Sequence, residues 1–148
     1  MKDSSLARYL GYAGLIPFVL LALLAWLLPG EQVQSFVSMA LAGYAALIVS
    51  FLGGIHWGIA WVSARSPTSP PALLRQHLLW GVAASLLAWP GLVMPPFAGL
   101  IWLGLVLILC YMVDRILYPR IGLQIWLGLR LWLSVVASLS CFMAAGVI

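Results

Sequence analysis

Apolar residues occupy most of the chain in five long stretches, which short segments containing proline, glycine, serine or charge separate from one another. The stretches cover about residues 6–28, 36–62, 74–93, 97–117 and 121–147. An α-helix needs roughly 20 apolar residues to cross a hydrocarbon layer about 30 Å thick. The pattern therefore predicts an all-α membrane protein, a bundle of five transmembrane helices. Because these stretches leave nothing for a further domain, we expect residues 1–148 to form a single transmembrane domain.

The composition agrees with this prediction and excludes several classes of protein. Hydrophobic residues make up 65% of the chain, charged residues only 7%, and the mean hydropathy is +1.14. Soluble domains carry about 25% charged residues, so this chain cannot cover a surface that faces water. A soluble enzyme, a disordered chain and a nucleic-acid-binding module are therefore excluded. The first apolar run exceeds the usual core of a signal peptide, roughly 7–15 residues, so we expect it to be retained.

The positive charges predict the orientation of the bundle. Six of the seven lysine and arginine residues fall at the N-terminus or in the connections on that side of the predicted membrane: Lys2, Arg8, Arg65, Arg75, Arg115 and Arg120. The connections on the other side carry Glu31 and no lysine or arginine. Positive charge favours the cytoplasmic side, which predicts a cytoplasmic N-terminus and a C-terminus outside. We expect a bacterial inner membrane, or the mitochondrial inner membrane if the source is eukaryotic.

Small side chains recur every four residues along the second stretch. They are Ser38, Ala42, Ala46, Ser50, Gly54 and Gly58. Lipid supplies no hydrophobic drive between helices, so small residues that permit close backbone approach are typical of helix contacts in membranes. The stripe predicts a neighbouring helix, which can belong to the same chain, to a second copy or to another membrane protein.

The fifth stretch carries a second pattern, a small and mildly polar face. Its members are Arg130, Ser134, Ser138, Cys141 and Ala145. This face predicts a helix turned toward the bundle interior. Its serine hydroxyls either bond back to carbonyls one turn earlier or form a polar track through Ser134 and Ser138.

Three ionisable residues lie inside the predicted spans, namely His56, Asp114 and Arg130. At 1.5 Å per residue they lie at similar depth in the cytoplasmic half, so three helices can bring them together in one polar cluster. Such residues are costly in a membrane and mark candidate functional sites. Asp114 and Arg130 are natural partners, because a carboxylate can bind a guanidinium bidentately. This pair either clips two helices together or serves a function.

The two histidines allow further interpretations. His56 has small, apolar neighbours and is either a packing residue or a proton relay, a ligand contact or a metal ligand. His77 lies at the inner start of the third stretch and, with His56, offers the two axial ligands of a haem. The chain contains neither a Cys-x-x-Cys-His nor a Glu-x-x-His motif, and no phosphate-binding loop. We therefore predict no catalytic residue, no metal site and no cofactor, with haem through His56 and His77 as the alternative.

Five short segments carry a resemblance to a known family. They are LGYAGLIPF at 10–18, SFLGGIHWG at 50–58, SLLAW at 85–89, DR at 114–115 and WLGLR at 126–130. Through them the chain resembles a family of small integral membrane proteins, catalogued as a domain of unknown function (number 3429), that is widespread in bacteria and includes the mitochondrial transmembrane protein 69. The resemblance implies a five-span membrane protein and no particular activity. Its motifs contain His56, Asp114 and Arg130.

Three functions remain open at this point. Packing patterns are abundant and catalytic motifs absent, which favours a non-enzymatic scaffold or assembly protein. It would lie in the lipid bilayer and contact a second copy or another membrane protein through the second stretch. The alternative is a proton or small-solute pathway through His56, Asp114 and Arg130, which Ser134 and Ser138 would extend outward. A second alternative is a redox protein that binds haem or another cofactor.

Overall fold

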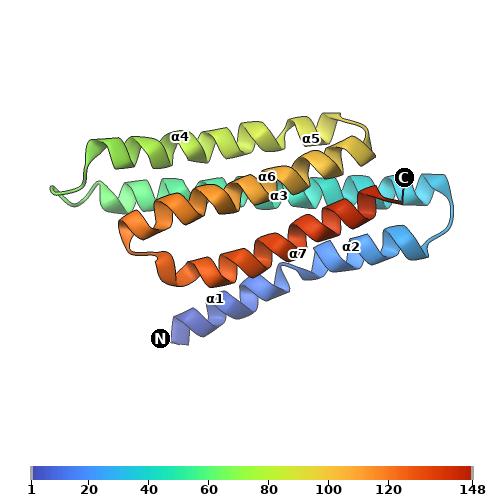
Figure 1. Ribbon diagram of the computed structural model, residues 1–148, viewed down its shortest axis with the longest axis horizontal. Coiled ribbons are helices and arrows are strands. Elements are labelled where there is room, and N and C mark those ends of the chain that lie inside the picture. Colours follow the sequence, from blue (N-terminus) through green and yellow to red (C-terminus); the bar gives the residue numbers. More distant parts are fainter. Residues whose placement is uncertain (1, 148) are drawn as a thin grey trace.

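The computed structural model describes residues 2–147, with side chains from Ser4 onward. Throughout this part of the chain the regular elements are helices, arranged side by side as a bundle (Figure 1). The α-helices are α1 (Lys2–Ala13), α2 (Ile16–Leu27), α3 (Glu31–Ser63), α4 (Pro71–Ala88), α5 (Pro90–Val93), α6 (Pro96–Leu117) and α7 (Leu127–Ala145). Two 3-10 turns, η1 (Tyr118–Ile121) and η2 (Gln124–Trp126), join α6 to α7.

The bundle has two chemically different ends. The N-terminus, the connection between α3 and α4 and the connection between α6 and α7 lie together at one end, and the C-terminus lies at the other (Figure 1). Because Arg65 and Arg120 lie in those two connections, we call this the basic end. Glu31 begins α3 at the opposite end.

Four helical segments are long and apolar enough to cross a membrane. They are Ser4–Leu27, Glu31–Ser63, Pro96–Ile121 and Gln124–Ala145. The third predicted stretch, 74–93, is not among them; it carries the polar residues Arg75, Gln76 and His77 near its start, which lower its mean hydropathy. The structure thus confirms the all-helical fold and supports four of the spans.

Prolines explain why two of the stretches contain breaks. Pro17 has no N–H to donate to the carbonyl of Ala13, and the first stretch divides there into α1 and α2. The hydroxyl of Tyr44, from α3, donates to the carbonyl oxygen of Gly14 at 2.8 Å in this break. Pro90 divides the third stretch in the same way, and there the indole N–H of Trp102 donates to the carbonyl oxygen of Leu87 at 2.7 Å.

The last span begins later than the sequence predicted. We expected a helix from about residue 121, whereas α7 starts at Leu127. Pro119 and Gly122 account for the difference, since proline interrupts helical hydrogen bonding and Gly122 has a φ of +78° that favours glycine. The chain turns here before it re-enters the bundle.

The small-residue stripe on α3 faces the bundle only over its first half. Ser38, Ala42 and Ala46 are buried, whereas Gly54 is exposed, and a Cβ added at Gly54 or Gly58 would meet nothing within 4 Å. A step of four residues advances the helix by about 40° beyond a full turn, so the stripe winds away from the core. The buried face instead follows steps of three and four: Ser38, Ala42, Ala45, Val49, Leu52, His56 and Ala60.

The close contact between α3 and α4 involves Gly53, the residue next to Gly54 of the stripe. A Cβ on Gly53 would lie 2.6 Å from the carbonyl oxygen of Gly81 in α4 and 3.0 Å from Cβ of Ala84. A Cβ on Gly81 would lie 2.8 Å from the carbonyl oxygen of Gly53. The α3 and α4 backbones therefore touch where neither residue has a side chain.

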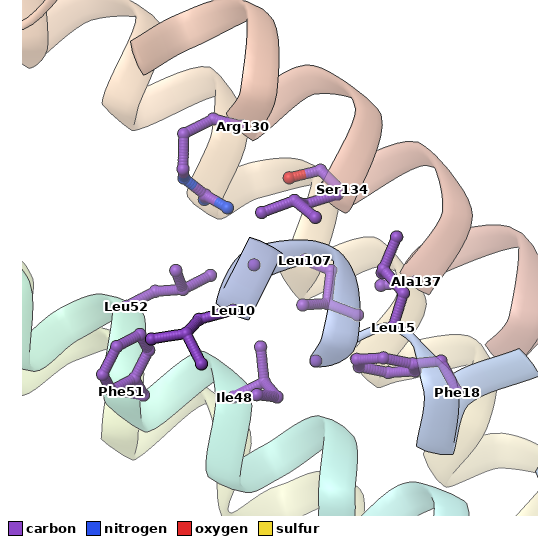
Figure 2. A pocket seen from close by; sticks show the side chains of 13 residues that line it. Leu10, Leu15, Phe18, Ile48, Phe51, Leu52, Leu107, Arg130, Ser134 and Ala137 are labelled. Atoms are coloured by element: carbon purple, nitrogen blue, oxygen red, sulfur yellow. The ribbon is translucent and has the colours of Figure 1, made fainter. Parts of the chain in front are cut away.

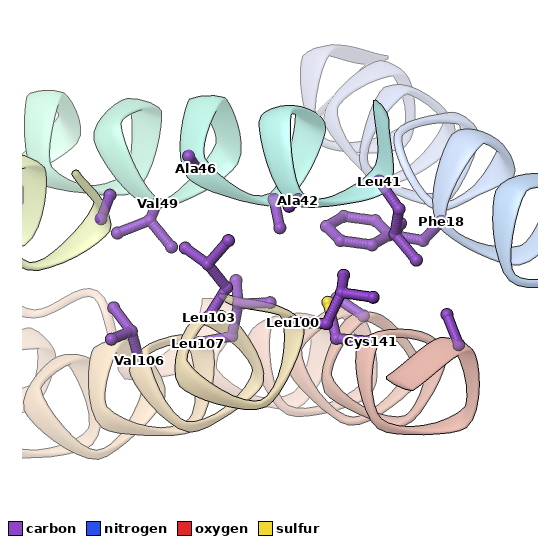
Figure 3. Close-up of a cluster of buried hydrophobic side chains, with 14 of the residues drawn as sticks. Phe18, Leu41, Ala42, Ala46, Val49, Leu100, Leu103, Val106, Leu107 and Cys141 are labelled. Carbon is purple, nitrogen blue, oxygen red and sulfur yellow. The ribbon is translucent and has the colours of Figure 1, made fainter. Parts of the chain in front are cut away.

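An apolar core fills the half of the bundle nearer the opposite end. Phe18 from α2, Leu41 from α3, Leu100 and Leu103 from α6 and Cys141 from α7 meet there (Figure 3). Each of these five residues is at most 1% exposed.

Candidate functional site

Four polar side chains, one from each of four helices, form a continuous hydrogen-bonded chain near the basic end. Nδ1 of His77 in α4 lies 2.8 Å from Nδ1 of His56 in α3. Nε2 of His56 lies 2.7 Å from Oδ1 of Asp114 in α6. Nε of Arg130 in α7 donates to Oδ2 of the same carboxylate at 2.8 Å. We call these four residues the polar chain.

An ionised Asp114 fixes the direction of the bond to His56, whereas the direction of the bond between the two histidines depends on whether His56 also carries a proton at Nδ1. A carboxylate only accepts hydrogen bonds, so His56 must carry its proton on Nε2 and donate to Asp114. If His56 is neutral, its Nδ1 accepts a hydrogen bond from Nδ1 of His77; if both of its nitrogens are protonated, it donates instead. Nε2 of His77 has no hydrogen-bond partner among the described residues.

The polar chain is buried and its charges balance. His56 is 0% exposed, His77 and Asp114 are 1% exposed and Arg130 is 7% exposed. Nη2 of Arg130 also lies 2.7 Å from Oδ2 of Asp114, so the guanidinium forms an ion pair with the carboxylate. An unpaired charge at the centre of a membrane helix costs about 2.5–3.5 kcal/mol, which explains why these two residues are found together.

Small residues position the histidines. The glycine contact between Gly53 and Gly81 lies about one turn from each histidine, and it brings the two backbones close enough for the rings to stack. The centroids of the His56 and His77 rings are 5.0 Å apart at an interplanar angle of 28°. The same region also holds a hydrogen bond from the indole N–H of Trp57 to the carbonyl oxygen of Leu78, at 3.0 Å.

Two residues of this region have other positions or partners than the sequence predicts. Tyr118 directly follows the fourth predicted stretch, which ends at about residue 117, but it is only 4% exposed and its ring centroid lies 5.7 Å from that of His56. Its position four residues after Asp114 places both residues on one helix face, a signal that the sequence contains. From the sequence alone we consider His77 only as a haem ligand. The hydrogen bond to His56 is not predicted, because that bond depends on how two helices pack against each other.

The serines of α7 lie on the buried face, as expected for a helix turned inward. Ser134 is 5% exposed and Ser138 is 3% exposed, and neither hydroxyl has a hydrogen-bond partner among the described residues. Ser140, in contrast, donates to the carbonyl oxygen of Val136 at 2.8 Å. The serines thus divide into one that bonds back to its own helix and two that do not.

The histidine pair does not have the geometry of a haem site. Metal–nitrogen bonds of histidine are about 2.0–2.1 Å long, so two axial nitrogens lie roughly 4 Å apart with the iron between them. Here the facing nitrogens are 2.8 Å apart and bonded to each other, which leaves no room for a porphyrin. In the described part of the chain no group of three or more histidine, cysteine, aspartate or glutamate residues is arranged to hold a metal ion.

Comparison with known proteins identifies the family. The sequence profile of the family described as "Protein of unknown function (DUF3429)" matches residues 4–146. The chain belongs to this family. The resemblance carried by the sequence motifs is therefore confirmed, and DUF3429 membership extends over every helix that forms the polar chain.

One curated relative adds to this picture of a membrane protein family. Transmembrane protein 69 of Xenopus tropicalis is 41% identical to the DUF3429 chain over 83 residues. The match covers 56% of this chain and 30% of the relative, so it spans less than a third of the relative's length. No solved structure matches the chain.

Proposed function

We propose that this DUF3429 protein crosses the membrane five times, with its N-terminus in the cytoplasm. The continuity of the bundle supports the fifth crossing. Helix α3 ends at the basic end and α6 begins at the opposite end, so α4 and α5 return the chain across the bundle between them (Figure 1). The cluster of arginines at the basic end favours its cytoplasmic location. The membrane would be the bacterial inner membrane, or its mitochondrial counterpart in a eukaryotic source.

We infer that the protein acts as a non-enzymatic scaffold or assembly partner in which the polar chain locks four helices in register. One observation carries this function: the hydrogen-bonded polar chain ends at Arg130. Beyond it, Ser134 and Ser138 are hydroxyls without hydrogen-bond partners among the described residues, and most other buried side chains, such as Leu103, are apolar. A polar chain that only holds helices in register needs hydrogen bonds between them, but it needs no polar path to the other side of the membrane. A transport pathway needs polar groups or water along its whole length.

The outward face of α3 supports contact with a partner. Ser50, Gly54 and Gly58 follow one another at intervals of four, and Gly54 is exposed with open space beside it. The Gly-x-x-x-Gly spacing is typical of membrane helices that pair closely with another helix. We propose that a second copy of the protein or another membrane protein covers this face.

Proton flux into proteoliposomes under an imposed potential tests the lock against the pathway. The lock predicts that wild-type protein conducts no more than empty liposomes and that His56→Ala lowers the folded yield without changing flux. A wild-type flux above this background that His56→Ala abolishes at equal protein density would overturn the lock. The pathway is our second candidate, since Nε2 of His77 lies at the start of the polar chain without a hydrogen-bond partner among the described residues.

Crosslinking in native-like membranes tests the partner face. Gly54→Leu places a large side chain on the proposed contact, and Gly128→Leu makes the same change on α7, where a Cβ also meets nothing within 4 Å. We expect Gly54→Leu to abolish dimer or complex bands that wild type and Gly128→Leu retain. Equal bands in all three proteins would show that the small face of α3 is not the contact.

A further inference from the structure

A cavity beside the polar chain has no part in locking the helices. Its volume is about 130 Å³, and it lies where the junction of α1 and α2 meets α3, α6 and α7 (Figure 2). Most of its lining is apolar, including Phe18, Leu52 and Leu107. Arg130 and Ser134 are the polar side chains in the described lining.

The two polar groups are positioned to donate hydrogen bonds into this space. Figure 2 shows the Arg130 guanidinium and the Ser134 hydroxyl on the same side of the cavity. Ser134 is 5% exposed and its hydroxyl lacks a partner among the described residues. Arginine has five N–H donors. Nε of Arg130 donates to Oδ2 of Asp114, whereas Nη2, which forms the ion pair, has no hydrogen-bond partner among the described residues. Both groups therefore suit an acceptor atom on a bound molecule.

The mouth of the cavity reaches the outer surface of the bundle. Leu10 of α1 and Phe51 of α3 line it and are 63% and 65% exposed. In a membrane-spanning bundle this surface faces lipid, so a molecule dissolved in the bilayer can enter sideways. An apolar tail can remain in the lipid while the head occupies the cavity.

Size and charge restrict the chemical class of the head. A dry cavity of about 150 Å³ accommodates benzene, so the space beside Arg130 suits one six-membered ring. The charges of Arg130 and Asp114 already balance, and a second carboxylate would be buried without a counter-charge, which is costly. A neutral carbonyl oxygen satisfies both donors without that cost.

We propose that the cavity binds a membrane-soluble ring carbonyl compound of the quinone class. Its carbonyl oxygen accepts hydrogen bonds from Arg130 and Ser134, its ring contacts Phe18 and Leu107, and its apolar tail leaves between α1 and α3. The site shares Arg130 with the polar chain but uses Ser134, which takes no part in the lock, so Ser134→Ala tests binding without breaking the Asp114–Arg130 pair.

Binding to the purified full-length protein in detergent micelles tests the proposal. The probe is a radiolabelled dimethyl-benzoquinone with a ten-carbon tail, and empty micelles give the background. The control ligand is the dimethyl-benzene with the same tail, which has the ring but no carbonyl. We expect saturable binding of the quinone at one molecule per chain. Binding of the control should be weaker by more than about tenfold, because it loses both hydrogen bonds that the carbonyl accepts.

Three variants of α7 locate the site. Ser134→Ala removes the hydroxyl and is expected to weaken quinone binding by about threefold to tenfold. Ser138→Ala makes the same change one turn further on, outside the cavity lining, and is expected to leave binding unchanged. Ala137→Phe fills the cavity and is expected to abolish binding. If this larger side chain prevents folding, Ser134→Ala is the decisive variant.

Other outcomes would overturn the proposal. Quinone uptake equal to that of empty micelles would show that the cavity holds no such ligand. Equal effects of Ser134→Ala and Ser138→Ala would place binding elsewhere. Displacement of the quinone by an equimolar fatty acid of similar length would show that the site takes a carboxylate, contrary to the charge argument.

Discussion

The two halves of the bundle hold their helices together by different means. Toward the basic end, His77, His56, Asp114 and Arg130 connect four helices through directional bonds of 2.7–2.8 Å. Toward the opposite end the buried core is apolar (Figure 3). Two hydrogen bonds between helices there run from an indole N–H to a backbone carbonyl, from Trp26 to Met143 at 2.9 Å and from Trp102 to Leu87 at 2.7 Å. Since lipid tails are as apolar as the core, burial alone does little to choose one helix arrangement over another. Our proposal that the polar chain sets the register of the helices rests on this difference.

Removing the acid of the polar chain should have the largest effect. Asp114→Asn leaves the buried charge of Arg130 without its counter-charge, and breaking such a pair costs about 3–5 kcal/mol. We expect a loss of this size in the free energy of unfolding, measured by detergent titration. Glu31→Gln makes the same acid-to-amide change on an exposed residue and should cost almost nothing. Equal stability of the two variants would show that the buried Asp114–Arg130 pair does not stabilise the half near the basic end.

A core truncation measures the apolar half. Leu103 is 0% exposed, whereas Leu105, on the same helix, is 54% exposed. Leu103→Ala should cost about 2–3 kcal/mol, the lower part of the usual range, because lipid already solvates apolar groups in the unfolded state. Leu105→Ala should lie within about 0.5 kcal/mol of wild type. A loss for Leu103→Ala larger than that for Asp114→Asn would make the apolar half dominant.

Gly53 and Gly54 are adjacent in α3, but Gly53 packs tightly against α4 whereas Gly54 faces open space. Gly53→Ala places a methyl group against the Gly81 carbonyl and should cost about 1–2 kcal/mol, since overpacking forces the helices apart. Gly54→Ala meets open space and should be neutral or gain up to about 0.5–1 kcal/mol from helix propensity. Thermal unfolding of both variants in dilute detergent gives the comparison. A reversed order would mean that the α3–α4 contact is misplaced.

The smallest expected effect concerns the proline break in the first span. Tyr44→Phe removes the hydroxyl that bonds to the Gly14 carbonyl, at a cost of about 1 kcal/mol. Tyr9→Phe removes a hydroxyl from a residue that is 75% exposed and serves as the control. Hydrogen exchange at residues 13–16 should rise in Tyr44→Phe alone. An increase in both variants would show that the hydrogen bond from Tyr44 does not stabilise the helix break.

Much of the fold could be predicted because it depends on composition and on local pattern. Long apolar runs specify membrane helices whatever their neighbours, and the rarity of charge singled out His56, Asp114 and Arg130. Their similar depth follows from the rise per residue, which is the same in every helix. The contacts among the three then required only that the helices be adjacent.

Other features depend on rotation about helix axes and could not be predicted in this way. The stripe that ends at Gly58 looks like one face in the sequence, although a four-residue step winds around the helix. The ring of His77 lies on His56 because Gly53 and Gly81 meet, a contact between residues distant in sequence. Proline positions such as Pro90 are visible in the sequence, but whether a helix bends or divides there depends on partners such as Trp102.

The central claim is that the Asp114–Arg130 pair acts as one unit that locks helices α6 and α7 in register. A double-mutant cycle of Asp114→Leu and Arg130→Leu, scored by the free energy of unfolding, tests it most directly. The lock predicts a loss for the double variant that is smaller than the sum of the single losses by about 2–3 kcal/mol, because no unpaired charge remains buried. Additive losses within about 0.5 kcal/mol would contradict the claim.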